Sequence, residues 1–183
     1  MTPTQEFEAL LTPILESAYG TAVHLTRHHQ EAENIVQEAA LRAFRAFASF
    51  QRGTNFRAWF LRIVTNLFFE ECRKTRRRPH TVSVDEAPDL FLFMESSKAP
   101  PCDDPAGAFM SRLSEEQVGK ALQALPDEFR VVATLYFTQD LSYAEIGEIL
   151  DVPPGTVRSR LHRARKLLQK SLWQVAQDAG LEV

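Results

Sequence analysis

The chain has 183 residues, and its 21 lysines and arginines stand against 24 aspartates and glutamates, which gives a formal net charge of −3. No apolar run approaches the ~20 residues that a membrane-spanning helix needs, so membrane insertion is excluded. Cys72 and Cys102 form no CxxC pair, and we expect free thiols in a soluble, cytoplasmic protein. With so little net charge, any nucleic-acid binding must come from local segregation of basic residues.

Two helical stretches are predicted near the start of the chain. Apolar residues recur at helical spacing over residues 4–27 and again over 30–47, where the stripe includes Phe44. Pro13 interrupts the first stretch, so it either kinks one long helix or starts a second helix capped by Thr12. The second stretch has a mixed polar face, which is either solvated or a docking face.

An aromatic loop and a basic helix end follow. The helical period lapses between Ala48 and Asn55, resumes at Phe56 and runs into residues 73–78, of which five are basic. Most of the aromatic residues over 44–69 must form core. A few near the loop between Phe50 and Trp59 could instead stack on unpaired bases, which contributes ~1–3 kcal/mol per base.

Residues 79–108 change character. They are acidic, contain five prolines and show no sustained period, so they predict a linker that is flexible at least in part. The apolar patch Leu90–Met94 within them either docks on a partner or packs on one of the domains.

The remaining residues, 109–183, predict a second helical domain that ends in a helix-turn-helix. Pro126 starts one helix, and Ser142 with Glu145 forms a capping box for the next. Residues 151–155 break that helix, because they contain two consecutive prolines and a glycine. In the last helix one narrow sector is apolar, and its members are Val157, Leu161, Ala164 and Leu168.

The opposite sector of this last helix is polar and basic, with donors suited to guanine edges and phosphate oxygens in a major groove. Its members are Ser159, His162, Arg163 and Lys166, flanked by Arg158 and Arg165. The sector is therefore interpreted as a DNA-reading face, the alternative being a solvated face of an ordinary helical hairpin. Arg160 lies nearer the core edge, so we expect a structural pair with an acid such as Glu145 or Glu148.

Two blocks of the chain together resemble the sigma-70 family of RNA polymerase sigma factors, in particular its extracytoplasmic-function members (ECF, group 4). The first block is AENIVQEAALRAFRAFASF followed by GTNFRAWFLRIVTNLFFEECRKTRRR, which is similar to the family's second region. The second block is ALPDEFRVVATLYFTQDLSYAEIGEILDVPPGTVRSRLHRARKLL, which is similar to its fourth region. The phrases LTR…EAENIVQE and FQRGTNFRAW further resemble the redox-stress subgroup.

The resemblance implies an all-α fold of two small helical domains. Residues 1–78 would form the region 2 domain, 79–108 the linker and 109–183 the region 4 domain. It also implies a sigma factor that binds core RNA polymerase and directs transcription initiation by recognising −35 and −10 elements and aiding strand opening. The implied partners are the clamp coiled coil and flap of core polymerase, promoter DNA, and an anti-sigma factor that clamps between the domains.

The resemblance also assigns site residues. The polymerase-binding helix would carry Asn34, Gln37, Glu38, Arg42 and Arg45. The −10 element would meet Phe50, Gln51, Arg52, Gly53, Thr54, Asn55, Phe56, Trp59, Asn66, Arg73, Lys74, Arg76 and Arg77. The −35 element would meet Pro154, Gly155, Thr156, Arg158, Ser159, His162, Arg163, Arg165 and Lys166.

Two other functions are compatible with parts of the sequence. A stand-alone helix-turn-helix regulator that binds an operator explains residues 141–168 but gives the first domain no role. A metal enzyme would use His24 and His28, four residues apart, with Glu31 and Glu33 nearby. No general base or third ligand can be placed there, and no Ser-His-Asp order or phosphate-binding glycine loop is present. We therefore expect no enzyme activity, no cofactor and no metal.

Overall fold

The computed structural model describes residues 2–76, 121–122 and 124–178, with the side chains of residues 76, 169 and 171–178 left aside. The described residues are all-α, as predicted, and contain no strand. Three predicted features lie outside them: the linker at 79–108 with its Leu90–Met94 patch, the basic residues Arg77 and Arg78, and residues 114–117.

The first helical group contains α1 (Pro3–Thr26), α2 (His29–Ala46), a short 3-10 helix η1 (Phe47–Ser49) and α3 (Phe56–Arg76). Thr2 and Gln5 cap α1 reciprocally, and Pro3 occupies the first turn, where its missing amide costs no helical bond. Pro13 lies inside α1, so of the two readings the single helix is right. Arg27 follows the last residue of the helix as its C-cap and adopts the left-handed conformation with φ 70°.

The second helical group contains α6 (Asp127–Gln139), α7 (Tyr143–Leu150) and α8 (Pro154–Asp178). The capping box predicted for Ser142 and Glu145 is present. Asp140 is the C-cap of α6 and Asp151 is the C-cap of α7, each with a positive φ, and Pro154 begins the last helix. The predicted helix-turn-helix is therefore confirmed, with α7 and α8 as its two helices.

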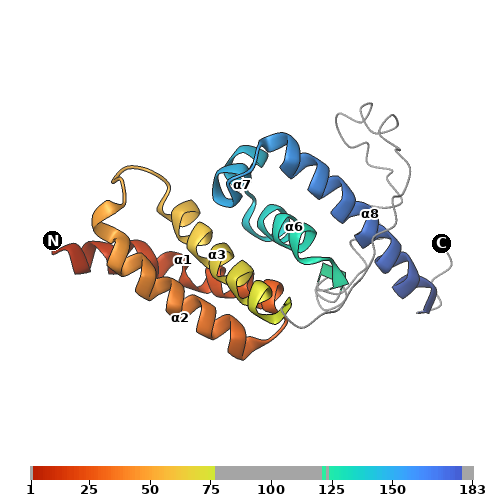
Figure 1. Ribbon diagram of the computed structural model, residues 1–183, viewed down its shortest axis with the longest axis horizontal. Helices are drawn as coiled ribbons and strands as arrows, with labels where there is room; N and C mark the ends of the chain where they lie inside the picture. The colour runs from red at the N-terminus through yellow and green to blue at the C-terminus, as the bar shows by residue number, and fades with distance from the viewer. Residues whose placement is uncertain (1, 77–120, 123, 179–183) are drawn as a thin grey trace.

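The two groups share one hydrophobic core. α6 packs against α1 and α7 packs against α3 (Figure 1). Buried residues form a single cluster that runs from Phe7 on α1 through Phe60 and Val64 on α3 to Ile146 and Leu161 in the second group. A smaller cluster joins α6 to α8 through Phe129, Ala133, Ala164 and Leu168, among others. Each large apolar side chain buried here contributes ~1.5–3 kcal/mol relative to exposure.

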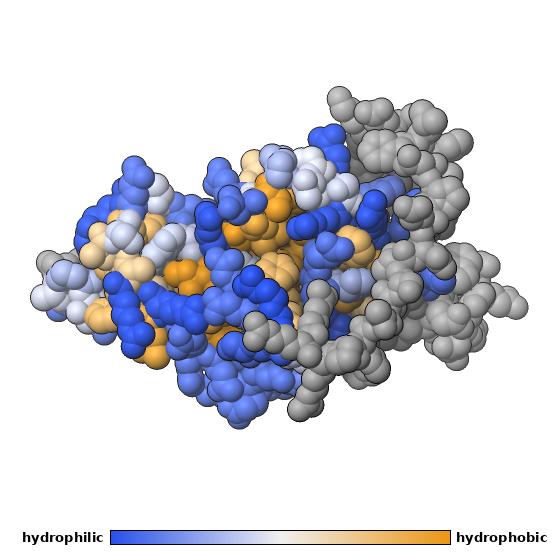
Figure 2. Space-filling model, in the orientation of Figure 1, coloured by the Kyte–Doolittle hydropathy of each residue, from blue (hydrophilic) through white to orange (hydrophobic). Residues whose placement is uncertain are grey.

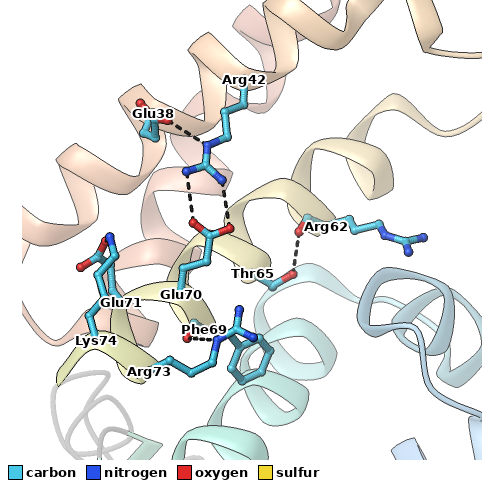
Figure 3. Close-up of polar contacts among 9 residues, drawn as sticks. All are labelled: Glu38, Arg42, Arg62, Thr65, Phe69, Glu70, Glu71, Arg73 and Lys74. Atoms are coloured by element: carbon cyan, nitrogen blue, oxygen red, sulfur yellow. Dashed lines mark hydrogen bonds and ion pairs between the residues drawn. The ribbon is translucent and has the colours of Figure 1, made fainter. Parts of the chain in front are cut away.

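An ion-pair clasp joins α2 to α3 on the outside of the first group (Figure 3). Arg42 donates from Nη1 and Nη2 to the two carboxylate oxygens of Glu70, at 3.0 and 3.1 Å, and from Nε to Glu38 at 2.8 Å. This fork matches a carboxylate in two places at once, so it fixes orientation as well as proximity. Arg42 also lowers the pKa of the Glu70 carboxyl through these hydrogen bonds.

Gly147 sits where α7 turns toward α8. A Cβ built at this position would lie 2.8 Å from the carbonyl oxygen of Val152, which is backbone and cannot rotate away. The amide of Val152 donates to the Gly147 carbonyl at 3.0 Å, so the backbone after α7 is in direct contact with the backbone of Gly147. Gly147 is therefore required by close approach, even though its own backbone is helical.

Gly147→Ala should destabilise the protein by about 1–3 kcal/mol, because the new methyl group displaces the turn before α8. Helix propensity alone predicts the opposite sign, a gain of about 0.5–1 kcal/mol. Gly20→Ala in α1 is the matched control, since nothing lies within 4 Å of its Cβ position and it should show that gain. Urea unfolding of both variants measures the difference. Stabilisation by Gly147→Ala would contradict the contact.

Glu70→Gln should lower the urea midpoint of unfolding at pH 7, because a neutral amide cannot neutralise the positive charge of the Arg42 guanidinium. Arg42 holds the pKa of Glu70 below its ordinary value of 4.5. The stability that the clasp contributes is therefore complete above that pH and is lost as pH falls through the lowered pKa. The gap between the wild-type and variant midpoints should narrow from pH 7 to pH 3. The control is Glu71→Gln, whose carboxylate pairs with Lys74 within one helix; equal gaps for both variants would contradict the clasp.

Candidate nucleic-acid and polymerase interface

The outward face of α2 carries the five residues assigned to polymerase binding. Asn34, Gln37 and Arg45 are exposed, whereas Glu38 and Arg42 are half-buried by the clasp to Glu70. Arg42 is thus engaged within the chain and positions α2 against α3. Sequence reasoning missed Glu70, because its partner lies 28 residues away and no local spacing links them.

Two large apolar residues lie on the same face of α2. Leu41 is 53% exposed and Phe44 is 47% exposed. The prediction that Phe44 belongs to the core stripe is wrong: its ring touches Phe7 edge-on at 5.3 Å but its other side faces outward. Leu41 was not singled out, although helical spacing places it between Asn34 and Arg45. Apolar residues exposed together in this way are typical of protein–protein contacts.

The rings at the two ends of the 50–56 loop are buried. Phe50 and Phe56 are each 6% exposed and meet edge-on at 5.3 Å. The expectation that they stack on an unpaired base is therefore not supported, because their faces are covered by Phe7, Phe47 and each other. Trp59 is half-buried beside them, with centroids 5.0 Å from Phe50 and 5.5 Å from Phe56. These packed rings hold the two ends of the 50–56 loop together.

The residues between these rings form an exposed loop. Gln51, Arg52, Gly53, Thr54 and Asn55 are all exposed, and Gly53 has φ +88°, which a side chain would strain. The Thr54 hydroxyl donates to the Gln51 carbonyl at 2.7 Å. The Asn55 side chain accepts from the Ala58 amide at 3.1 Å and so caps α3. The loop therefore has a defined shape with its polar tip outward.

Arg52 is held above this loop by Glu6 of α1. Its Nε and Nη2 donate to the two carboxylate oxygens of Glu6 at 2.8 and 3.0 Å, and its guanidinium lies 5.6 Å from the centre of the Phe47 ring. These hydrogen bonds lower the pKa of Glu6. The arginine is exposed but oriented, which reduces the conformational entropy lost on contact with a phosphate.

The outer stripe of α3 continues from this loop. Asn66, Arg73 and Lys74 are exposed. Arg73 donates to the Phe69 carbonyl at 3.3 Å, and Lys74 pairs with Glu71 at 2.6 Å (Figure 3). Arg76 is the last residue of α3. Arg62 lies one turn before Asn66 on the same stripe and was not singled out from the sequence.

The second helix of the helix-turn-helix has the two faces that the sequence predicts. Val157, Leu161, Ala164 and Leu168 are buried. Pro154, Gly155, Arg158, Arg163 and Lys166 are exposed, and Thr156, Ser159, His162 and Arg165 are half-buried. The guanidinium of Arg165 lies 5.3 Å from the centre of the Tyr136 ring, which orients it. The exposed members form one basic face at the start of α8.

Arg160 has a structural role, but the predicted partner is wrong. It pairs with Glu128 on α6 at 3.7 Å, and neither Glu145 nor Glu148 of α7 is the acid. The reason is packing: α8 packs against α6, and Arg160 lies at the edge of that contact, beside Glu128.

The suggested histidine pair does not form a metal site. α1 ends at Thr26 and α2 begins at His29, so His28 lies between the two helices and shares no helix face with His24. Within the described residues, no group of three or more His, Cys, Asp or Glu side chains could hold a metal ion. Burial lowers the pKa of His24, which favours the neutral ring.

In the part of the chain that the structure describes, no helix is both long and apolar enough to cross a membrane.

Both helical groups match known protein families. Residues 10–78 match the model of sigma-70 region 2, and residues 115–168 match that of sigma-70 region 4. The ECF RNA polymerase sigma factor SigW of Bacillus subtilis is 34% identical over 86% of this chain and 83% of its own length. RNA polymerase sigma-H factor of Pseudomonas aeruginosa is 31% identical over 94% of this chain and 89% of its own.

Solved structures agree. RpoE, a sigma factor crystallised with the anti-sigma factor NepR from Bartonella quintana, superposes with a TM-score of 0.69 at 27% identity, covering 92% of this chain and 97% of that one. CnrH, solved with the cytosolic domain of CnrY, shares the fold with a TM-score of 0.63 at 20% identity, over 92% of this chain and 88% of its own. The chain therefore belongs to the extracytoplasmic-function group of the sigma-70 family and is an RNA polymerase sigma factor.

Proposed function

We propose that this sigma factor divides promoter recognition between its two helical groups. The first group binds core polymerase through α2 and holds the opened −10 element on the 51–55 loop and the outer stripe of α3. The second group reads the −35 element with the start of α8. The observation that carries the proposal is the pair of opposite faces on α8, with Val157 and Leu161 buried and Arg158, Arg163 and Lys166 exposed.

The α2 face supports a protein contact. Leu41 and Phe44 offer an apolar centre, and Asn34, Gln37 and Arg45 surround it with polar groups. An apolar centre with a polar rim is typical of stable interfaces. We assign this face to the clamp coiled coil of core polymerase, and the region 4 group to the flap.

The chemistry then belongs to the polymerase. This chain contributes promoter choice and strand opening, and it makes and breaks no covalent bond. Strand opening needs a base held outside the stack, which costs a few kcal/mol. Because Phe50 and Phe56 are buried, polar groups of the loop and the half-buried Trp59 would have to offset that cost together with the polymerase channel.

Regulation by a protein partner is part of the proposal. The structures of RpoE and CnrH contain NepR and the cytosolic domain of CnrY. By this likeness we expect a cytoplasmic sigma factor that an anti-sigma factor holds inactive. Assignment to the redox-stress subgroup rests on the phrases LTR…EAENIVQE and FQRGTNFRAW. Cys72 is half-buried on α3 and is where an oxidant response of this chain would be sought first.

Run-off transcription tests the function directly. Purified core RNA polymerase is incubated with a fragmented bacterial genome, with and without this protein. We expect new discrete start sites that share −35 and −10 elements. Absence of new starts, together with specific duplex binding by the chain alone, would instead indicate an operator-binding regulator.

Arg163→Ala should weaken binding to the −35 element found in this way by ~1–3 kcal/mol, because an arginine that contacts a guanine edge in two places is worth about that much. Fluorescence anisotropy with cognate and scrambled −35 duplexes measures the change. Lys170→Ala, exposed further along α8, is the control and should bind like wild type. An equal loss on scrambled DNA would reassign Arg163 to the DNA backbone.

A further inference from the structure

The junction between the two helical groups contains a buried polar side chain, Gln139. Gln139, the last residue of α6, is 4% exposed, although its neighbours in the junction are mostly apolar. Its amide nitrogen donates to the Ser17 carbonyl at 3.2 Å and to the Thr21 hydroxyl at 2.8 Å, both on α1. Its amide oxygen accepts from the Ser17 hydroxyl at 2.7 Å.

Arg57 of α3 completes this junction. It donates from Nη2 to the Gln139 side-chain oxygen at 2.6 Å and to the Gln139 backbone carbonyl at 2.8 Å, with a further bond from Nε at 3.2 Å. Gln139 is thus bonded to α1 and α3 at once, and a cation meets the C-terminal end of α6, where the helix dipole is negative. We call this set of contacts the Gln139 latch. The latch holds the second group against the first.

A second arginine of α3 meets the end of α7. Arg62 donates from Nη1 to the Glu148 carbonyl at 3.3 Å, and its Nη2 lies 3.9 Å from the carboxylate of Asp151, the C-cap of α7. Figure 3 shows Arg62 extending from α3 on the side away from Arg42. A carbonyl of a helix C-terminus and a carboxylate are the acceptors that a phosphate group would replace.

Arg62 shares its stripe of α3 with two residues already assigned to the −10 element. Asn66 follows it by one helical turn and Arg73 by three turns, so the three side chains leave α3 on one side. Figure 2 shows hydrophobic residues surfacing along the junction of α3 with α6 and α7, with hydrophilic ones beside them. The end of α7 contacts the first member of this stripe, Arg62, whose side chain stays 47% exposed.

We propose that Arg62 is a phosphate contact of the −10 strand, and that the end of α7 occupies it in the closed arrangement described here. The Gln139 latch keeps α7 in place, so region 4 docking and strand binding compete for the same guanidinium. This inference rests on the proposed role of α3 in holding the opened strand. It adds Arg62 to the DNA-binding residues and makes Gln139 a positioning residue that controls access to it.

The experiment measures DNA affinity and shape together on the full chain. Fluorescein-labelled dT20 reports strand binding by anisotropy over a range of salt concentrations, because a phosphate contact does not depend on base sequence. Small-angle X-ray scattering reports the radius of gyration. The variants are Gln139→Leu, Arg62→Ala and the double variant. Glu16→Gln, an exposed change on α1 next to Ser17, is the control.

Gln139→Leu should increase the radius of gyration and tighten dT20 binding at least threefold. Arg62→Ala should weaken binding about threefold and reduce the salt slope by ~0.7, the value for one phosphate contact on a single strand. The double variant should be extended but should lose the gain. Glu16→Gln should match wild type. A double variant that keeps the full gain of Gln139→Leu, or a Gln139→Leu protein that changes neither shape nor affinity, would overturn the inference.

Two further arms keep the test decisive. If circular dichroism shows that Gln139→Leu does not fold, Asp151→Asn replaces it: this residue is 89% exposed in its side chain, and asparagine tolerates its left-handed backbone. It should still tighten binding and leave the shape closed, and no gain would overturn the competition. Absence of salt-dependent dT20 binding in every variant would instead overturn the strand-binding role itself.

Discussion

One buried amide decides how this sigma factor is assembled. Gln139 sits at the end of α6 and bonds to Ser17, Thr21 and Arg57. Leaving a buried amide without such partners costs ~1–3 kcal/mol. These bonds therefore favour the one position of α6 along α1 and α3 in which all of them can form. Hydrophobic burial brings α6 against α1 and α3 without choosing a position along them. The amide chooses it, and the position of α7 over Arg62 follows.

The surfaces assigned to polymerase and DNA are prepared by ion pairs inside the chain. Arg42 is bound by Glu38 and Glu70, which sets the angle between α2 and α3. Arg52 is bound by Glu6, which orients it above the 51–55 loop. Partly exposed ion pairs of this kind contribute at most about 1 kcal/mol each to stability. Their effect is to fix the positions of the exposed face of α2, the 51–55 loop and the outer stripe of α3 relative to one another.

Much of the fold could be predicted because its signals are local. The capping box at Ser142, the prolines before α8 and the helical spacing of Val157 and Leu161 act within a few residues, where capping and periodicity determine the backbone. The same applies to the exposed face of α2 and to the basic face of α8. The predictions that the structure does not support depend on contacts between helices. Phe44 was predicted to be buried in the core, and Phe50 and Phe56 were predicted to stack on an unpaired base. Arg160 was predicted to pair with an acid of α7.

By itself, the sequence determined which segments are helical and which helix face is basic, since both depend on contacts within one or two turns. It also carried the family resemblance. Only the tertiary structure decided which of these residues are available. Glu70, Arg57, Arg62 and Gln139 carry no distinctive spacing, and their partners lie 28 to 122 residues away. Their roles arise where helices meet side by side, which no local pattern encodes.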